Sequence, residues 1–266
     1  MDQEQSFQSL MDKLFPFSYV KWCADPSNID FNDSVPFRGI LTEDFLHFIM
    51  KAIWVRSNVL FPKEILKFFN EFCDQLPYSS PDTYIVHVVC LCQIVADITT
   101  DIHDSFISVF SLVTSISTLA SRQCFDLYQL TPKILEVFYN EALKEEFYKQ
   151  DGWNGLERYL QNTEYEKWYN KLRSITSADE NERFKEEFLE STQLNILTPE
   201  NNPLDIIEEK LFDENMLDIT RMVISTVEPS LWENLNAFAS TDKATSNIYE
   251  SESETECISL EEFEEK

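Results

Sequence analysis

Apolar positions along the chain recur mostly at the three- and four-residue spacing of α-helices. The clearest short example near the start consists of Phe7, Leu10, Met11 and Leu14. These positions fall on one face of a helix, and Pro16 predicts the end of that helix because proline removes a backbone donor. The chain is therefore expected to begin with a short amphipathic helix.

The longest apolar stretch is Pro81–Ala120, which contains no glycine, lysine or arginine. Two apolar segments, Tyr84–Ile98 and Phe106–Leu119, flank a short acidic turn. They predict one helix ending near Ile98 and a second running from about Asp104 to Ala120. Both segments are apolar nearly all round, which is typical of helices with neighbours on several sides. This pair is expected to form the centre of the fold.

Helix-start signals divide much of the remaining chain. Thr42 is a predicted N-cap, Ser177-Ala-Asp-Glu180 fits a capping box, and Thr131–Pro132 predicts a further start. Starts near residues 42, 62, 81, 104 and 132 lie about 20–28 residues apart, close to the helix spacing in HEAT and armadillo repeats. The prediction is an all-α protein, either a HEAT/armadillo-like helical stack or an irregular helical bundle.

Domain organisation follows the same pattern. Residues 1–41 are expected to hold the first helix and an ordered extended segment, residues 42–239 the helical domain, and residues 240–266 a disordered acidic tail. The chain has only 3 glycines. This scarcity argues against a β-sandwich or barrel with many tight turns, and against a glycine-rich phosphate loop.

The helical pattern breaks down between Phe15 and Ile40, where three prolines and several turn-type sequences occur. The segment is nevertheless rich in aromatic residues, which a solvated linker would not be. It is expected to pack across the helices in an extended form, or alternatively to provide a surface for a partner. The candidate partner-binding residues here are Phe17, Tyr19, Trp22, Phe31 and Phe37.

The charge balance is strongly acidic, because 48 Asp and Glu stand against 21 Lys and Arg and give a net charge of −27. A surface of this sign repels phosphate backbones, so direct binding to nucleic acid is not expected. It suits a basic protein partner. The alternative is that the charge only keeps an aromatic-rich protein in solution.

Cysteine usage and hydropathy predict location. The six cysteines follow no disulfide framework, and the N-terminus has neither the basic nor the apolar region of a signal peptide. The apolar tract Ile85–Val95 is shorter than the roughly 20 residues of a membrane helix. The protein is expected in the cytoplasm, the nucleus or both, without membrane association.

No metal site, cofactor or enzymatic activity is predicted. His87 and Cys90 are three residues apart, but no Cys-x-x-Cys pair occurs, and buried structural cysteines are the expectation. Common catalytic motifs, including G-x-S-x-G, H-E-x-x-H and the P-loop, are absent from the sequence.

The dipeptide His103–Asp104 resembles the metal-binding pair of HD-domain phosphohydrolases, which are all-helical. The resemblance covers these two residues and a helical background, and it implies a metal-dependent hydrolase as an alternative function. The simpler interpretation places Asp101 and Asp104 as acids at the N-terminus of the second central helix, with His103 alongside.

The acidic tail Thr241–Lys266 carries two kinds of candidate site. Ser251, Ser253 and Ser259 each have a glutamate three residues later, which resembles the sites of acid-directed kinases such as casein kinase 2. Apolar residues stand among the acids and resemble a short linear binding motif, similar in character to a SUMO-interacting motif. They are Ile258, Leu260 and Phe263. A purely solubilising tail is the alternative.

Together these features predict a non-enzymatic protein-binding adaptor or assembly factor, with a chaperone-like hold on a basic client such as a ribosomal protein or histone. The alternatives are a scaffold subunit of a larger intracellular complex and the HD-like hydrolase.

Overall fold

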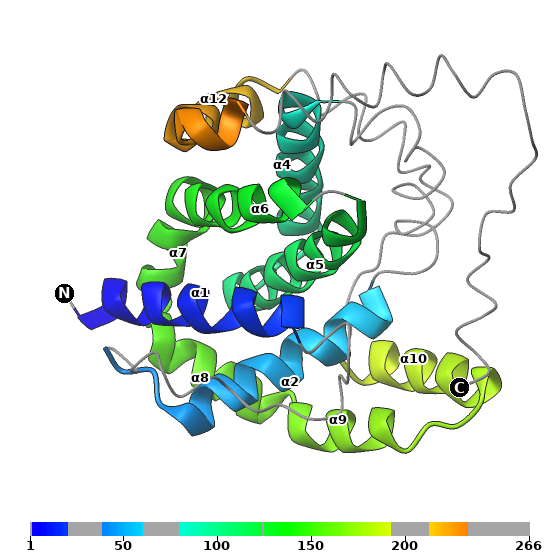
Figure 1. Ribbon diagram of the computed structural model, residues 1–266. Coiled ribbons are helices and arrows are strands. Elements are labelled where there is room, and N and C mark those ends of the chain that lie inside the picture. Colours follow the sequence, from blue (N-terminus) through cyan, green and yellow to red (C-terminus); the bar gives the residue numbers. More distant parts are fainter. Residues whose placement is uncertain (1, 21–38, 61–79, 124, 193–212, 234–266) are drawn as a thin grey trace, which may run out of the picture.

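The computed structural model describes residues 2–20, 39–60, 80–123, 125–192 and 213–233 (Figure 1). Helix accounts for 88% of these residues and no strand occurs among them, so the all-α prediction is confirmed. The regular HEAT- or armadillo-like stack is not confirmed.

The helices have the bounds α1 (Asp2–Val20), α2 (Glu43–Leu60), α4 (Pro81–Ile98), α5 (Ile102–Gln123), α6 (Phe125–Phe138), a π-helical turn (Tyr139–Leu143), α7 (Lys144–Lys149), α8 (Gly152–Asn162), α9 (Tyr165–Arg173), α10 (Ala178–Thr192) and α12 (Glu214–Thr226). From α4 to α10 the helices follow one another with short connections. Residues 229–233 are also helical. The predicted central pair corresponds closely to α4 and α5.

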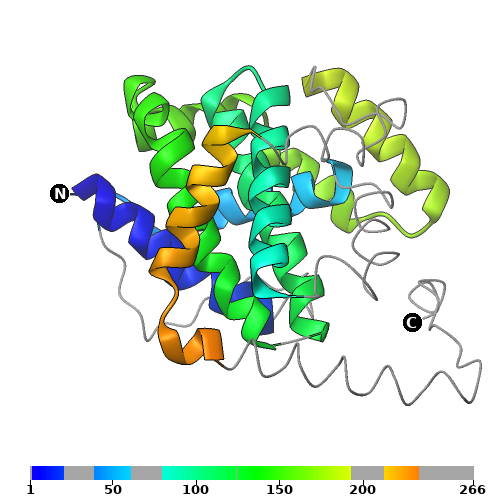
Figure 2. The ribbon, with the colours of Figure 1, turned by 90° about the horizontal axis from the view of Figure 1, so that it is seen from above.

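Helix α5 lies at the centre and joins two groups of helices. On one side α4, α6 and α12 pack against one another, and on the other α2 packs against α8, α9 and α10 (Figures 1 and 2). Both α2–α9 and α4–α12 bring together elements far apart in sequence. A solenoid repeat contacts mainly its neighbours along the chain, and this packing differs from that pattern.

The centre of the core is aromatic. Phe106 of α5 stacks on Phe110 and Phe147, with ring centroids 4.3 Å and 5.0 Å apart, and Trp153 meets it edge to face. Phe7 of α1 stacks on Tyr139 at 4.0 Å. Aromatic pairs of this kind stabilise a core beyond the area that they bury, so they fix α1, α7 and α8 around α5.

Helix α1 corrects the prediction that Pro16 ends the first helix, because the helix continues to Val20. Pro16 costs one backbone hydrogen bond within the helix. The buried side chains of Leu10, Leu14 and Phe15 hold the helix in place around this defect. Phe17 and Tyr19 therefore lie on a helix, whereas the sequence predicted an extended segment.

Helix α6 corrects a second boundary. It begins at Phe125 and contains Pro132, whereas Thr131–Pro132 was predicted to start a helix. Leu127, Leu130 and Ile134 are buried at helical spacing across the proline. This continuous apolar face outweighs the lost backbone bond and was the signal in the sequence that favoured one uninterrupted helix.

The helix caps predicted at Thr42 and Ser177 are confirmed. Thr42 accepts a hydrogen bond from the backbone amide three residues later at 3.2 Å, and Ser80 caps α4 in the same way at 3.2 Å. Ser177 accepts from the amide of Glu180 at 3.3 Å, as in a capping box. The Glu180 carboxylate accepts from the amide of Thr176, and backbone hydrogen bonds from Thr176 and Ser177 lower its pKa.

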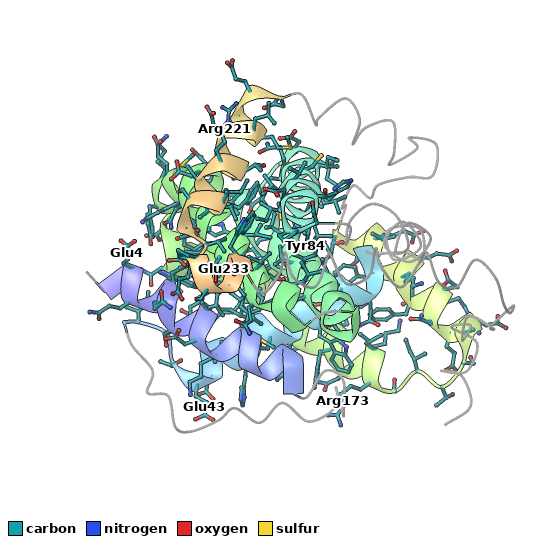
Figure 3. The ribbon with its side chains drawn as sticks, turned by 45° about the horizontal axis from the view of Figure 1, so that its top comes forward. Glu4, Glu43, Tyr84, Arg173, Arg221 and Glu233 are labelled. Carbon is teal, nitrogen blue, oxygen red and sulfur yellow. The ribbon has the colours of Figure 1, made fainter. Side chains whose placement is uncertain are left out.

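Helix α4 is long and apolar enough to cross a membrane by length and composition, with a mean hydropathy of 1.3. However, 61% of it is buried within the protein, which is also what a core helix shows. Tyr84, inside the helices in Figure 3, donates or accepts a 2.8 Å hydrogen bond with Thr131 of α6. Cys90 and Cys92 are buried on α4, and burial raises the pKa of the Cys92 thiol.

Candidate functional site

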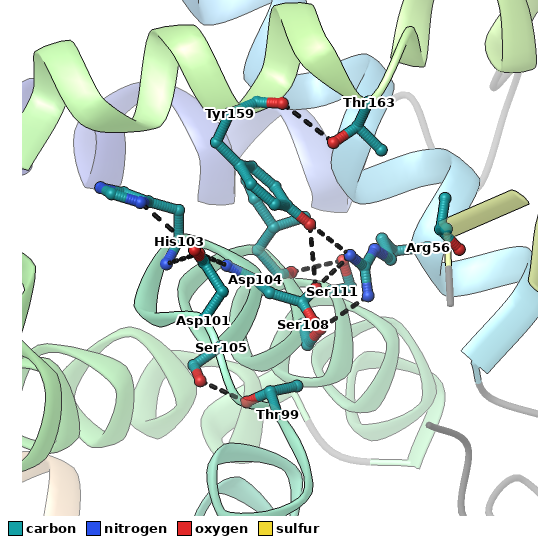
Figure 4. Close-up of polar contacts among 12 residues, drawn as sticks. Arg56, Thr99, Asp101, His103, Asp104, Ser105, Ser108, Ser111, Tyr159 and Thr163 are labelled. Atoms are coloured by element: carbon teal, nitrogen blue, oxygen red, sulfur yellow. Dashed lines mark hydrogen bonds and ion pairs between the residues drawn. The ribbon is translucent and has the colours of Figure 1, made fainter. Parts of the chain in front are cut away.

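A fully buried arginine links four helices beside the α4–α5 turn (Figure 4). Arg56 of α2 donates through Nη2 to Asp104 and, at 2.6 Å, to the Tyr159 hydroxyl. Its Nη1 donates to Ser108 at 3.1 Å and its Nε to Tyr165 at 2.5 Å. Asp104 also accepts from Tyr159 at 3.0 Å. The cluster therefore fixes α5, α8 and α9 relative to α2.

The ionisation of the cluster reflects burial and mutual charge. Burial raises the pKa of Asp104, and the neighbouring Arg56 guanidinium and Tyr159 hydroxyl oppose the rise. Burial acts to lower the pKa of Arg56, but Tyr165, Tyr159 and Asp104 together raise it. Burial raises the pKa of Tyr159 as well, so its hydroxyl stays protonated and can donate to Asp104. A paired arginine and carboxylate is the state that this network stabilises.

The turn before α5 is held by Asp101. Its Oδ1 accepts from the backbone amides of His103 and Asp104 at 2.8 Å and 3.1 Å, which is an N-cap arrangement. The sequence expectation of acids at this N-terminus is confirmed for both residues, and the side chain of Asp104 turns inward to Arg56. Asp101 lies in the short link between α4 and α5, and Asp104 lies in the first turn of α5, so both belong to the central pair.

His103 and Asp104 have different surroundings. The His103 ring packs against Phe147 and Tyr159, and burial lowers its pKa despite the favourable charge of Asp101. Asp104 is engaged with Arg56. Within the described ranges, no three His, Cys, Asp or Glu side chains lie close enough together to hold a metal ion.

A cavity of about 390 Å³ lies between the α4–α5 turn, the α8–α9 turn and the last described turn of α10. Its lining consists of Ile98, Thr99, Thr100, Asp101, Asp104, Tyr159, Asn162, Thr163, Glu164, Lys167, Trp168, Ser191 and Thr192. The volume is at the lower end of the roughly 300–1,000 Å³ of small-ligand pockets. Buried Asp104 connects the cavity to Arg56, while Asn162, Glu164 and Lys167 are exposed. The arginine cluster thus supports one wall of the cavity.

Carboxylates dominate the charge of the cavity, with Asp101, Asp104 and Glu164 facing a single ammonium group, Lys167. The dipoles of the adjoining helices oppose one another, because α4, α8 and α10 end here and α5 and α9 begin here. Asp104 is neutralised by Arg56 and Glu164 by Lys167. Among the described residues, Asp101 has no lysine or arginine partner, so it leaves the cavity with excess negative charge.

Lys167 occupies part of this cavity. Its Nζ lies 3.0 Å from a Glu164 carboxylate oxygen and 5.6 Å from the centre of the Trp168 ring. Lys171 approaches the same ring at 5.7 Å, but it pairs with Glu187 and does not line the cavity. The ammonium of Lys167 therefore interacts with a carboxylate and an aromatic ring that both line the cavity.

Negative charge also dominates the surface around these elements. Most of the lysine and arginine side chains that the structure describes pair with a carboxylate; they are Lys51, Arg56, Lys144, Lys149, Arg158, Lys167, Lys171, Lys185 and Arg221. Figure 3 shows Glu4, Glu43 and Arg221 at the periphery of the molecule. Because acids outnumber bases by 48 to 21 in the chain, pairing leaves a large excess of carboxylates.

The partner-binding residues predicted from sequence do not meet at this cavity. Phe17 and Tyr19 lie on α1, and the structure does not describe their side chains. The other candidates lie outside the described residues: Trp22, Phe31, Phe37, Ser251, Ser253, Ser259, Ile258, Leu260 and Phe263. In the described part of the chain, Ile40 is the large hydrophobic residue that is exposed.

Sequence reasoning missed Arg56, although a signal was present. Arg56 follows Ile49 by seven residues and Ile53 by three, so it lies on the buried face of the predicted helix. A charged residue at such a position needs a buried partner. Asp104 and Tyr159 are 48 and 103 residues away, and nothing in the sequence pairs them with Arg56.

The chain matches no protein-family model, no curated protein and no solved structure.

Proposed function

We propose that this protein is a non-enzymatic binding protein, an adaptor or assembly factor that holds a basic protein client in the cytoplasm or nucleus. The single observation that carries the proposal is the carboxylate excess of the cavity, centred on Asp101. A carboxylate beside a cavity and without a lysine or arginine partner favours a cation from outside the chain. The His103 imidazole lies 3.5 Å from the Asp101 carboxylate, but burial lowers the pKa of this imidazole and so disfavours its charged form.

The chemistry of the cavity supports binding more than catalysis. Its buried carboxylate, Asp104, is held by Arg56 and Tyr159, so it is not poised to take or give a proton. Hydroxyl groups and an amide make up much of the remaining lining. These groups can accept hydrogen bonds from a cationic side chain of a client.

The rest of the surface fits the same role. An excess of carboxylates accelerates the encounter with a basic partner and repels acidic ones. The scaffold-subunit alternative is less well supported, because an obligate interface is usually apolar and Ile40 alone is a large exposed hydrophobic residue in the described ranges.

The test is the binding of a fluorescein-labelled nona-arginine peptide, measured by fluorescence anisotropy with the full-length protein. At about 0.15 M salt the Debye length is about 8 Å, so acids remote from the bound peptide contribute little. Asp101→Asn keeps a good N-cap and removes the charge. We expect this substitution to weaken binding about fivefold, the effect of losing one partly exposed charge pair.

Asp213→Asn is the matched control. Asp213 caps α12 in the same way, accepting from the amides of Asn215 and Met216 at 3.0 Å and 3.2 Å, and it does not line the cavity. It should leave the affinity unchanged. Equal effects of the two substitutions, or no binding of the peptide at all, would contradict the proposal.

A further inference from the structure

The cavity contains a cation of the protein itself, the ammonium group of Lys167. An external ligand that binds in the same place would have to replace this group. Lys167 joins Glu164 and the Trp168 ring across the α8–α9 turn. Its side chain is 66% exposed, so the contact is a surface ion pair that contributes little stability. Such a side chain can leave the cavity at small cost.

We infer that the cavity is a subsite for one arginine side chain of the client, and that Lys167 occupies it until the client binds. This inference rests on the proposed function. When Lys167 moves into solvent, the Glu164 carboxylate and the space beside the Trp168 ring become available, in addition to Asp101. The incoming guanidinium then replaces the ammonium of Lys167.

Arginine fits this lining better than lysine. Acceptor groups come from separate elements: Asp101 from the α4–α5 turn, Thr163 and Glu164 from the α8–α9 turn, and Ser191 from α10. A guanidinium offers five donors in a fixed plane and can reach several acceptors at once, and it also stacks on aromatic rings. An ammonium is more strongly hydrated and acts as a single point of charge.

The occupant is assigned by charge complementarity. The ionisable lining has three carboxylates against one ammonium, and the fully buried Arg56 holds Asp104 from behind without lining the cavity itself. An anionic ligand would meet the uncompensated charge of Asp101. A neutral ligand would leave that charge without a partner.

The experiment compares Lys167→Met with Lys171→Met, using a peptide with one arginine in an alanine–serine host and its lysine counterpart. Both substitutions remove one positive charge from the neighbourhood of Trp168, but Lys171 lies outside the cavity lining. Titration calorimetry with the full-length protein should show that Lys167→Met binds the arginine peptide at least about twofold tighter than Lys171→Met does. The wild-type protein should prefer the arginine peptide to the lysine peptide.

The outcomes separate this inference from the proposed function. Asp101→Asn could weaken binding selectively while Lys167→Met gives no gain in affinity over Lys171→Met. In that case the inference that the client displaces Lys167 is wrong, and the proposal of a basic client still stands. If the lysine peptide binds as tightly as the arginine peptide, the arginine assignment is wrong. If neither Asp101 nor Lys167 affects binding, both proposals fail.

Discussion

Arg56 is the residue on which the arrangement of the cavity depends. It is fully buried, and its four hydrogen bonds to side chains reach α5, α8 and α9. A buried ion pair offsets a large desolvation cost with its own attraction and with further hydrogen bonds. Removing one partner leaves the other charge uncompensated inside the protein, which is far more costly than removing both.

Arg56→Met is therefore expected to lower the free energy of unfolding by about 3–5 kcal/mol, measured by urea denaturation. The double variant Arg56→Met with Asp104→Leu should lose less than the single variant, because no charge then remains buried. A loss below about 1 kcal/mol in the single variant, or additive losses in the double variant, would show that the cluster is not an essential buried ion pair.

At the scale of elements, the close approach of α8 to the α4–α5 turn places Tyr159 beside Asp104. Gly155 makes this approach possible, because an added Cβ would lie 2.3 Å from the Gln150 carbonyl oxygen and 2.6 Å from His103 Nε2. The 2.3 Å contact is with backbone, which cannot turn aside as a side chain could. A glycine inside a helix would otherwise be a weakness.

Gly155→Ala is expected to destabilise the protein even though alanine favours helix by about 1 kcal/mol over glycine. The measurement is thermal or urea unfolding. Asn154→Ala, at an exposed position of the same helix, is the control and should be neutral or slightly stabilising. If Gly155→Ala stabilises the protein as well, α8 does not pack as closely as described.

The sequence predicted which segments form helices better than it predicted where those helices begin and end or which helices pack together. The periodicity of Tyr84–Ile98 located α4 almost to the residue, because a serine cap and Pro81 mark its start. The helix boundaries predicted at Pro16 and Pro132 were wrong, because the burial of neighbouring apolar side chains outweighed the loss of a backbone hydrogen bond at each proline. Local spacing carries information about one helix, whereas the packing of α2 against α9 depends on the whole chain.

The candidate site was even less accessible from sequence. Asp101 was identified as a helix-terminal acid, which is its local role. Its position beside a cavity arises from the α8–α9 turn and α10, which lie about 60 to 90 residues further along the chain. No local pattern links these segments, so the site follows from the fold and not from a motif.

For the whole molecule, the proposed preference for a basic client rests on the acidic charge at long range and on the cavity at contact distance. The net charge of −27 acts over a Debye length and favours the approach of any basic protein. The cavity acts at contact distance, where Asp101 and the surrounding acceptors can select one cationic side chain. Salt should therefore screen the long-range attraction strongly and affect the local contact much less.

The most direct test is a double-mutant cycle between Asp101 and the arginine of the single-arginine peptide, with citrulline as the neutral replacement of that arginine. Titration calorimetry would give the four affinities of wild type and Asp101→Asn for the two peptides. The account predicts a coupling free energy of about 1 kcal/mol or more for Asp101, and close to zero when Asp213→Asn takes its place. A coupling near zero for Asp101 would contradict the claim that a cation from the client binds in this cavity.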